Sequence, residues 1–550
     1  MIRDPHNPCR LAEGGQIDRD APLSFRFNGT TYRGYRGDTL ASALLANGVR
    51  VVARSFKYHR PRGILSAGEE EPCALVEVGE GAARVPNSRA TLVQLEEGLV
   101  VLSQNGWPAL GFDLGRIVDF THPLWPAGFY NKTFKWPRWH TWEGLVRRAA
   151  GLGRPLPGPD PDRYEQVNAH CDLLICGAGA TGLAAALTAG RSGLRVILAE
   201  QGPACGGALE REHVLLDGRP GRAWALDAAA RLRAMPNVIV LERTAVVGVY
   251  DHNVTTLLQT APRPAPSGDG WRECLWTVRP RHILLAGGAI EQGLIFPNND
   301  RPGIMLASAV RHYLNVHAVC PGRKIVIATN NDSAYQTLFD LARHRVPVSA
   351  VVDLRDAVSD ELRERTLAAG AELLTGARIA DTQGFTGLRS IRIAGHSGAD
   401  RGRRSCDLLA VSGGWSPRVH LLAHARGSLR FDAATQCFLP DRLPPGWSVA
   451  GCANGTWGLQ AAFDEAAAAA RDVCRELGRP VVAEELPRIA QCARAGGRSV
   501  GRRASPVDRP CARRNPRRRG TGGARGLRLR GAFQALHHHR HVDRPGQDRQ

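Results

Sequence analysis

The chain has 550 residues, of which 43% are hydrophobic and 23% charged, and 61 of them are Gly. This length exceeds what one hydrophobic core supports, so we expect several domains, and the composition excludes a disordered or fibrous protein. The net charge of +20 would favour a nucleic-acid partner, but residues 488–550 carry +14 of it, so the remaining 487 residues give no reason to expect specific nucleic-acid binding.

The first predicted elements begin near residue 24. Residues 25–34 alternate around Asn28-Gly29, a pair that tolerates positive φ at both positions, so they predict an antiparallel hairpin. Residues 40–48 follow as a short helix, and Asp38-Thr39 precedes it as the capping segment. A hairpin followed by a helix indicates a small β-grasp domain.

Residues 54–63 carry five basic side chains, counting His59, interleaved with two aromatic ones. Such a stretch could hold phosphate or lie beside a partner's surface. A solvated loop is an equally open interpretation.

Residues 106–168 are rich in Trp, Pro and Gly and show weak periodicity, as is typical of an extended connector. Exposing its tryptophan side chains to water would be unfavourable in free energy, so we expect the connector to pack over a neighbouring domain. These are Trp107, Trp125, Trp136, Trp139 and Trp142.

A dinucleotide-binding unit is predicted from residue 169 onward. Residues 171–176 form a buried parallel strand, 177–182 a Gly-x-Gly-x-x-Gly turn, 183–193 a helix and 195–199 a second strand. The strand before the turn and the helix after it make a chance match improbable.

Each glycine of the turn is required for a different physical reason. Gly177 permits the tight turn, Gly179 lets the backbone approach a pyrophosphate, and Gly182 allows the helix to pack closely. The start of the helix then faces the anion with free main-chain amides. Glu200 follows the second strand, where a carboxylate accepts hydrogen bonds from ribose hydroxyls and would repel a 2′-phosphate, which disfavours NADP.

Residues 281–289 predict a buried strand that lies against the cofactor, with a plain core strand as the alternative. Residues 323–328, 334–343 and 348–353 predict a second strand–helix–strand unit, whose turn at 329–333 has no glycine. A turn without glycine keeps a pyrophosphate at a distance, so we expect this second unit to be degenerate.

Two later segments are expected to return to the first dinucleotide-binding domain. Residues 406–415 and 448–457 each read as a buried strand, and the second of them precedes an Ala-rich helix at 459–477. We expect both strands to complete the sheet of the first domain.

The 13 cysteines include no pair or cluster at metal-binding spacing, so we expect no metal site. Their odd number, the absence of a signal peptide and the absence of an apolar run of about 18 residues indicate reduced thiols in a cytoplasmic protein without a membrane partner.

Several segments together resemble the α subunit of heterotetrameric sarcosine oxidase, across about residues 20–480. They are residues 37–48, 54–63, 128–134, 248–252, 299–303 and 410–415. The resemblance implies a complex that converts sarcosine, oxygen and tetrahydrofolate into glycine, hydrogen peroxide and methylenetetrahydrofolate. It also implies a β subunit that holds FAD and the oxidising site, FMN at the interface with that subunit, and further γ and δ subunits.

The same resemblance implies NAD in the glycine-turn site of this chain, with FAD in the same site as the alternative. The implied cofactor contacts are Gly177, Gly179, Thr181, Gly182, Glu200, Gln201, Ala208, Val247, Gly451 and Thr456. No catalytic residue is implied on this chain.

The expected fold is α/β, with two dinucleotide-binding domains of the FAD/NAD(P) disulfide-reductase type after a ferredoxin-like β-grasp domain. The β-grasp domain (1–105) contains Cys73 but no set of four cluster cysteines, and we expect it to be structural. The connector follows at 106–168, the first dinucleotide domain at 169–300 and 400–486, and the degenerate one at 301–399.

Residues 487–550 form an Arg-rich tail without resemblance to the family, whose members continue into a folate-binding domain. Codons for residues 535–549, read one base later, can encode the family's expected sequence, so we expect a frameshift between about residues 485 and 498. A genuine basic arm for RNA or membrane phosphates is the rival interpretation of the tail. For the whole chain, an FAD-binding subunit of an opine- or proline-type dehydrogenase and a noncatalytic binding module are the alternatives.

Overall fold

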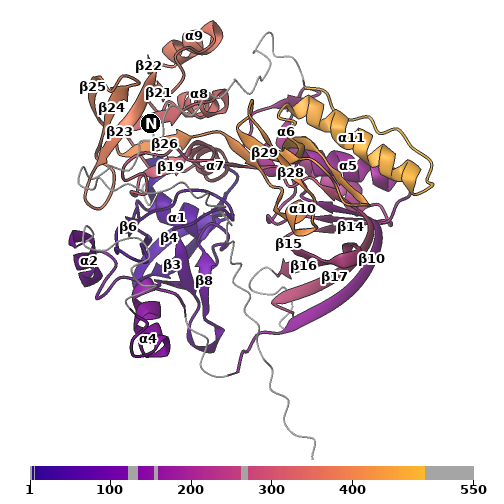
Figure 1. Ribbon diagram of the computed structural model, residues 1–550, viewed down its shortest axis with the longest axis horizontal. Helices are drawn as coiled ribbons and strands as arrows, with labels where there is room; N and C mark the ends of the chain where they lie inside the picture. The colour runs from indigo at the N-terminus through magenta and orange to yellow at the C-terminus, as the bar shows by residue number, and fades with distance from the viewer. Residues whose placement is uncertain (1–2, 5–6, 122–133, 154–158, 262–269, 490–550) are drawn as a thin grey trace, which may run out of the picture. The chain divides into compact units, whose positions relative to one another are not determined.

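The computed structural model describes residues 3–4, 7–121, 134–153, 159–261 and 270–489 (Figure 1). The basic tail and Trp125 lie outside the described residues. Among the helices within these ranges, none combines the length and apolar character needed to cross a bilayer.

The amino-terminal domain is a five-stranded sheet in the order β4-β3-β9-β7-β8, packed against helix α1. Asn28 and Gly29 have φ of 48° and 82°, which confirms the predicted hairpin turn. Thr39 caps α1 by accepting a hydrogen bond from the Ser42 amide. The elements are β3 (Asp18–Phe27), β4 (Thr30–Arg36), α1 (Leu40–Ala46), β7 (Leu75–Val78), β8 (Val85–Arg89) and β9 (Leu99–Ser103).

The first dinucleotide-type domain contains a seven-stranded sheet in the order β14-β11-β10-β17-β16-β15, with β30 also paired to β17. Its strands are β10 (Tyr164–Cys176), β11 (Val196–Ala199), β14 (Val238–Leu241), β15 (Thr244–Val249), β16 (Thr255–Thr260), β17 (Glu273–Leu285) and β30 (Trp447–Val449). β10 begins at Tyr164, inside the range expected for the connector, because it continues alongside β17. β30 runs parallel to β17, which confirms the predicted return of the chain to this sheet.

Three helices cover one face of this sheet. They are α5 (Ala180–Arg191), α6 (Gly221–Arg233) and α11 (Leu459–Glu476). Small residues of α5 let α11 approach closely, and Phe463 of α11 packs into the same core as Trp224 of α6, with ring centroids 5.0 Å apart. Figure 1 shows α11 beside α5, although they are far apart in the sequence.

The second unit has a parallel five-stranded sheet in the order β19-β26-β20-β21-β22. Its elements are β19 (Ile304–Leu306), α7 (Ala307–His317), β20 (Ile325–Thr329), α8 (Tyr335–Arg343), β21 (Val348–Asp353), α9 (Asp360–Ala368), β22 (Glu372–Leu374) and β26 (Leu408–Ser412). An antiparallel sheet of β23 (Ala377–Gln383), β24 (Ser390–Gly395) and β25 (Asp400–Ser405) adjoins it in sequence.

The position of β26 corrects one expectation. Residues 406–415 were predicted to complete the first sheet, but β26 pairs with β19 and β20 of the second. A short, fully buried strand carries the same apolar pattern in either sheet, so its composition could not identify its neighbours. The segment after β26 forms β27 (Trp415–Pro417), which pairs with β18 (Ala289–Glu291).

The β-grasp domain and the second unit share one hydrophobic core, which includes Leu40 and Leu44 of α1 together with Val310 and Leu314 of α7. The buried Tyr313 hydroxyl of α7 donates to the Ser66 carbonyl across this junction at 2.9 Å. The amino-terminal domain therefore packs on the second unit through a shared core.

The basic stretch 54–63 is neither a solvated loop nor an open phosphate site. Arg54 and His59 are buried, and His59 lies 2.7 Å from the Asp113 carboxylate. Arg60 pairs with Asp119 at 2.6 Å, and Arg62 pairs with Asp300. Four of the five basic side chains thus join this segment to other parts of the chain, while Lys57 lies over the Tyr58 ring of the same segment.

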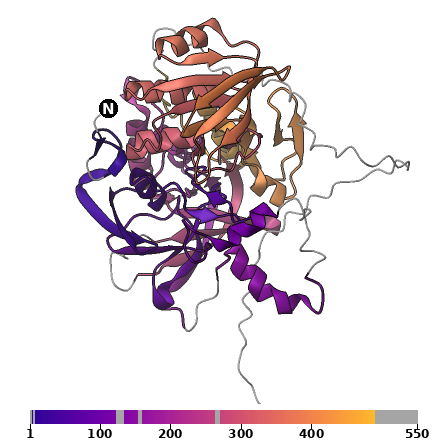
Figure 2. The same ribbon diagram turned by 90° about the vertical axis from the view of Figure 1, so that its left-hand side faces the viewer.

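Of the four connector tryptophans that the structure describes, three are exposed, contrary to the expectation, and Trp142 is partly buried. Trp107 is 70% exposed and Trp136 83% exposed, and Trp139 of α4 (Trp139–Ala150) is also exposed. Phe120, the last residue of α2 (Ile117–Phe120), is 76% exposed. Helix α4, in purple, stands at the edge of the chain in Figure 2. The expectation failed because an apolar composition indicates only that a surface is better covered. It does not indicate whether another part of the same chain or another molecule covers it.

Candidate functional site

The turn between β10 and α5 has the geometry that its three glycines require. Gly177 has φ of +103°, and a Cβ there would lie 2.7 Å from the Ala286 carbonyl oxygen. A Cβ on Gly182 would lie 1.8 Å from the Gly177 carbonyl oxygen, so only glycine lets α5 start this close to the turn. A Cβ on Gly179, by contrast, would meet nothing within 4 Å, so open space lies above the middle of the turn.

The first turn of α5 offers unpaired main-chain donors. Gly179 occupies the N-cap position, where it makes no side-chain capping bond, and the first turn holds no acidic residue. The amides of Ala180, Thr181 and Gly182 are available as donors, and the helix dipole makes this end positive. An anion placed over Gly179 would satisfy them.

Glu200 lies directly after β11, beside this turn. Its Oε2 accepts a hydrogen bond from the Ala178 amide and its Oε1 accepts one from the Gly202 amide, both at 2.8 Å. Burial raises the pKa of Glu200, and these two backbone hydrogen bonds oppose the rise. Each carboxylate oxygen keeps a second lone pair, so Glu200 can still accept from a ribose hydroxyl.

A cavity of about 650 Å³ opens over the turn. The predicted site residues that line it are Gly177, Gly179, Thr181, Glu200, Gln201 and Ala208. This size and this mixture of apolar wall and convergent polar groups are typical of a cofactor site.

Four predicted contacts lie outside this lining. Gly182 is buried in the packing of α5, and the Val247 side chain is 53% exposed while its neighbour Val246 faces the cavity. Gly451 lies directly behind the turn, since a Cβ there would be 2.3 Å from the Thr181 hydroxyl oxygen. The Thr456 amide donates to the Gly451 carbonyl at 3.0 Å, while Cys452 and Trp457 on either side line the cavity.

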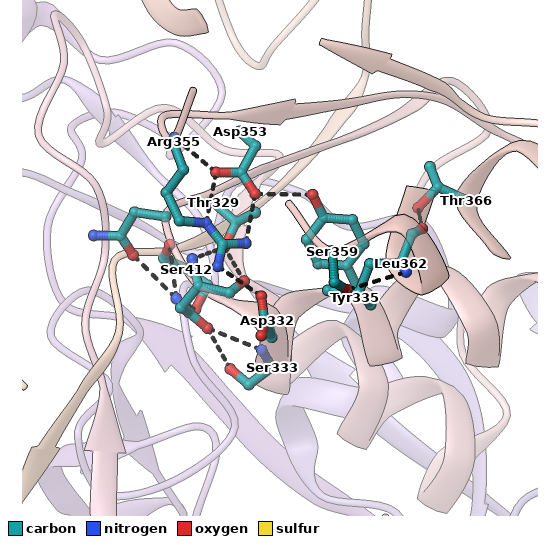
Figure 3. A network of polar contacts seen from close by, with 12 residues as sticks. Thr329, Asp332, Ser333, Tyr335, Asp353, Arg355, Ser359, Leu362, Thr366 and Ser412 are labelled. Carbon is teal, nitrogen blue, oxygen red and sulfur yellow. Dashed lines mark hydrogen bonds and ion pairs between the residues drawn. The ribbon is translucent and has the colours of Figure 1, made fainter. Parts of the chain in front are cut away.

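The cavity extends to the second unit, where Asn331, Asp332, Ser333 and Gln336 line it. The turn after β20 is closed by its own side chains, because Asn331 Oδ1 accepts from the Ser333 amide at 3.1 Å and from its hydroxyl at 2.6 Å. Figure 3 shows this network of polar contacts.

Asp353 ends β21, the position that Glu200 holds after β11. Arg355 donates to both of its carboxylate oxygens at 2.8 and 3.1 Å, and the Tyr335 hydroxyl donates to it at 2.8 Å (Figure 3). Arg355 also bonds to Asp332 at 2.6 Å. The strand-end acid of the second unit is thus occupied by donors of the same chain.

The wall of the cavity includes charged residues that no local motif indicated. Glu69 belongs to the β-grasp domain and pairs with Arg418, from the segment after β27, at 2.5 Å. The charges of Arg418 and Glu69 both act on Glu200. No sequence pattern places residues 69, 200 and 418 together, because three separate parts of the fold supply them.

Cys73 does not fit an iron–sulfur cluster. Burial raises the pKa of its thiol to about 12, and it is the only cysteine between residues 20 and 106, whereas a cluster needs four ligands. The buried Glu71 carboxylate organises the loop instead, because it accepts hydrogen bonds from the amides of Leu65, Ser66, Cys73 and Ala74.

Two protein-family models match parts of this chain. Residues 172–246, which include the glycine turn and Glu200, match the family described as FAD dependent oxidoreductase. Residues 20–106 match the family described as 2Fe-2S iron-sulfur cluster binding domain. The second match agrees with the β-grasp fold of this span, whereas its single Cys73 disagrees with cluster binding.

Two curated relatives match most of this chain. The chain is 46% identical over 476 residues to the sarcosine oxidase subunit alpha of Rhizobium meliloti (strain 1021), which covers 86% of this chain and 48% of that protein. It is 37% identical over 474 residues to the subunit of the same name from Corynebacterium sp. (strain P-1), which covers 84% of this chain and 44% of the other. The chain therefore spans about half the length of these relatives, and the predicted resemblance to the family is confirmed over that part.

Among solved structures, L-proline dehydrogenase from P. horikoshii matches with a TM-score of 0.58 at 19% identity, covering 88% of this chain and 77% of that one. This similarity concerns the fold alone. Together with the two family models, it confirms an α/β fold of the FAD/NAD(P) disulfide-reductase type that follows a ferredoxin-like domain.

Proposed function

We propose that this chain, a relative of the sarcosine oxidase α subunits over 86% of its length, is the NAD-binding subunit of a complex that oxidises sarcosine. One observation carries the proposal. The uncapped start of α5 and the Glu200 carboxylate face one cavity beside three glycines, an arrangement that suits the diphosphate and ribose of a dinucleotide.

The residues divide the binding between them. The main-chain amides at the start of α5 hold the diphosphate, and Glu200 accepts from a ribose hydroxyl. A 2′-phosphate at that hydroxyl would be repelled by the carboxylate, so NAD is favoured over NADP. When bound, NAD supplies a nicotinamide ring that can accept or donate hydride.

The amine-oxidising chemistry belongs to other subunits in this proposal. A β subunit would hold FAD and the sarcosine site, FMN would lie at its interface with this chain, and γ and δ subunits would complete the complex. The overall reaction converts sarcosine, oxygen and tetrahydrofolate to glycine, hydrogen peroxide and methylenetetrahydrofolate. No residue of this chain is assigned a catalytic role.

The second unit would bind no dinucleotide of its own. Its turn lacks glycine and is closed by Asn331, and its strand-end Asp353 is held by Arg355 and Tyr335. A ribose hydroxyl would have to compete with a charged guanidinium for that carboxylate. We therefore expect one dinucleotide per chain.

FAD in the glycine-turn site is the second candidate, as in the α subunit of an opine- or proline-type dehydrogenase. The match of residues 172–246 to the FAD dependent oxidoreductase family favours it. A noncatalytic binding module is the third candidate, and it predicts no bound dinucleotide.

Cofactor extraction distinguishes the three candidate functions. The full chain is purified, denatured with acid, and its released small molecules are identified by mass analysis, with an absorbance spectrum of the native protein as a second measurement. NAD at about one equivalent supports the proposal, FAD with flavin absorbance supports the second candidate, and neither after incubation with both cofactors supports the third. Coexpression with a β subunit then tests whether flavin copurifies with the complex.

A further inference from the structure

Arg211 follows a short segment, residues 206–210, that packs on the glycine turn at 177–182. Gly206 forms a bridge with Gly179, and a Cβ on Gly207 would lie 3.0 Å from the Gly179 Cα, so this segment packs directly on the turn. The 3-10 helix η4 (Gly207–Glu210) then leads to Arg211, whose side chain lines the cavity.

The backbone of Arg211 is fixed by hydrogen bonds, whereas its side chain has no partner among the described residues. Its amide donates to the Ala208 carbonyl at 3.1 Å, and its carbonyl accepts from Asn315 at 2.8 Å. Within the described part of the chain, its guanidinium makes no hydrogen bond or ion pair, and its Nε is closed to solvent. The Nε–H of Arg211 has lost water without gaining a partner, which is unfavourable in the free protein, while the side chain as a whole is partly exposed in the cavity.

Arg311, which lines the same cavity, shows the contrast. Its guanidinium bonds to both oxygens of Glu212 at 3.1 and 3.2 Å and to Asp340 at 2.7 Å. The charges of Glu212, Arg311, Glu291 and Glu70 act on Arg211, yet no described carboxylate lies within 4 Å of its guanidinium nitrogens. Among the described residues, Arg311 therefore has a set of structural partners that the Arg211 side chain lacks.

Two more donors of the cavity wall share this condition. Arg418 Nε and Trp457 Nε1 are buried without a hydrogen-bond partner in the described chain, and both residues line the cavity. Together with Arg211 Nε, these are all N–H groups, and none is an acceptor. A cavity wall with spare donors favours a ligand rich in acceptors or negative charge.

We propose that Arg211 contacts the cofactor directly, with its guanidinium bonding to the diphosphate oxygens of the dinucleotide held by the 177–182 turn. This inference rests on the proposed function. The diphosphate is the permanently anionic group that NAD and FAD share, and a guanidinium pairs with its oxygens through two parallel N–H bonds. The assignment therefore holds for either cofactor.

The test measures binding of adenosine, ADP and NAD to the full chain, freed of copurified nucleotide, by titration calorimetry. In Arg211→Met, which keeps the length and volume of an unbranched side chain, we expect about tenfold or weaker binding of ADP and NAD. Adenosine binding should change by less than about twofold, because adenosine carries no phosphate. The loss of ADP and NAD affinity in Arg211→Lys should be intermediate, since lysine keeps the positive charge but lacks the two parallel N–H donors of a guanidinium.

Arg219→Met is the matched control, because Arg219 is exposed and lies outside the cavity lining. Unchanged ADP binding in Arg211→Met, or an equal loss for ADP and adenosine, would overturn the inference. So would a loss seen with NAD but not with ADP, since the contact would then lie beyond the diphosphate. If the unsubstituted chain binds neither ADP, NAD nor FAD, the proposed function itself fails.

Thermal unfolding of the ligand-free variants separates binding from a structural role. We expect Arg211→Met to unfold at the same temperature as the unsubstituted chain or higher, because the substitution removes a buried N–H donor that has no partner in the described chain. A clear fall in the ligand-free midpoint, with Arg219→Met unchanged, would mark Arg211 as structural and contradict the inference.

Discussion

At the scale of single residues, the three glycines of the turn meet different steric constraints. The sequence indicated that Gly177 and Gly182 could not carry side chains, and the contacts at 2.7 and 1.8 Å show which carbonyl oxygens would be struck. Gly179 differs, since nothing in the chain occupies the space that its side chain would take. Its lack of a side chain leaves room for a ligand and is not needed for folding.

Gly179→Val should therefore abolish dinucleotide retention while leaving the fold intact. Its φ of −70° is open to valine, and the new side chain would extend into the place expected for the diphosphate. Cofactor content after purification is the measurement, and the circular dichroism spectrum checks the fold. Gly111→Val is the matched control, because Gly111 also has open space and no positive φ. A Gly179→Val protein with full cofactor content would contradict the placement of the diphosphate.

Glu200 gives a second prediction at this scale. Glu200→Ala should weaken NAD binding by about 1–3 kcal/mol through loss of charged hydrogen bonds. Glu165→Ala, at an exposed residue of β10, should leave binding unchanged. Equal affinities of the two variants would refute the role given to Glu200.

The pH dependence of NAD binding tests the same carboxylate. Burial raises the pKa of Glu200, so its charged form is lost at a higher pH than in an ordinary glutamate. NAD affinity should fall as the pH drops through that raised value, because the protonated group loses an acceptor. Glu200→Gln should remove this part of the pH profile, and an identical profile in the variant would show that another group titrates.

At the scale of elements, buried polar contacts decide how the β-grasp domain is attached. Arg10 Nη2 lies 2.6 Å from Asp38 at the start of α1, and Arg10 also donates to the carbonyl of His317 in α7 at 2.7 Å. Burial alone would raise the pKa of Asp38, but His317 and Arg10 outweigh it and hold the value below that of an ordinary aspartate. Neither side chain of the Arg10–Asp38 pair is accessible to solvent.

Asp38→Asn should lower the free energy of unfolding by about 3–5 kcal/mol, because it leaves the Arg10 charge buried without its partner. The effect should shrink as the pH falls through the lowered pKa of Asp38, where the original carboxylate also becomes neutral. Urea denaturation at neutral and acidic pH measures both. Glu80→Gln, in the exposed pair with Arg26, should cost less than about 1 kcal/mol. A similar small loss for both variants would show that the buried pair contributes little.

At the scale of the whole molecule, the apolar residues of the connector point to a partner. Trp107, Phe112, Leu114, Ile117 and Phe120 are all at least half exposed within 14 residues of sequence, and we call them the 107–120 surface. The relatives of this chain are subunits by name. We expect a β subunit to cover this surface.

Phe120→Ser should weaken the association with a coexpressed β subunit about tenfold or more, because an interface that buries a phenylalanine gains about 1.5–3 kcal/mol. The dissociation constant of the purified subunits is the measurement. Phe431→Ser is the control, since Phe431 is 53% exposed on a distant strand, β28 (Leu429–Asp432). If both variants bind the β subunit as the unsubstituted chain does, the 107–120 surface is not the interface.

The sequence by itself determined what depends on near neighbours in the chain. The hairpin at Asn28-Gly29, the capped helix after Thr39 and the strand, turn and helix around Gly177 follow from backbone sterics and periodicity over a few residues. Only the tertiary structure decided which sheet received β26, and only it showed that Arg211 Nε has no partner among the described residues. Pairing and burial depend on residues hundreds of positions apart, and a local pattern carries no information about which of them meet.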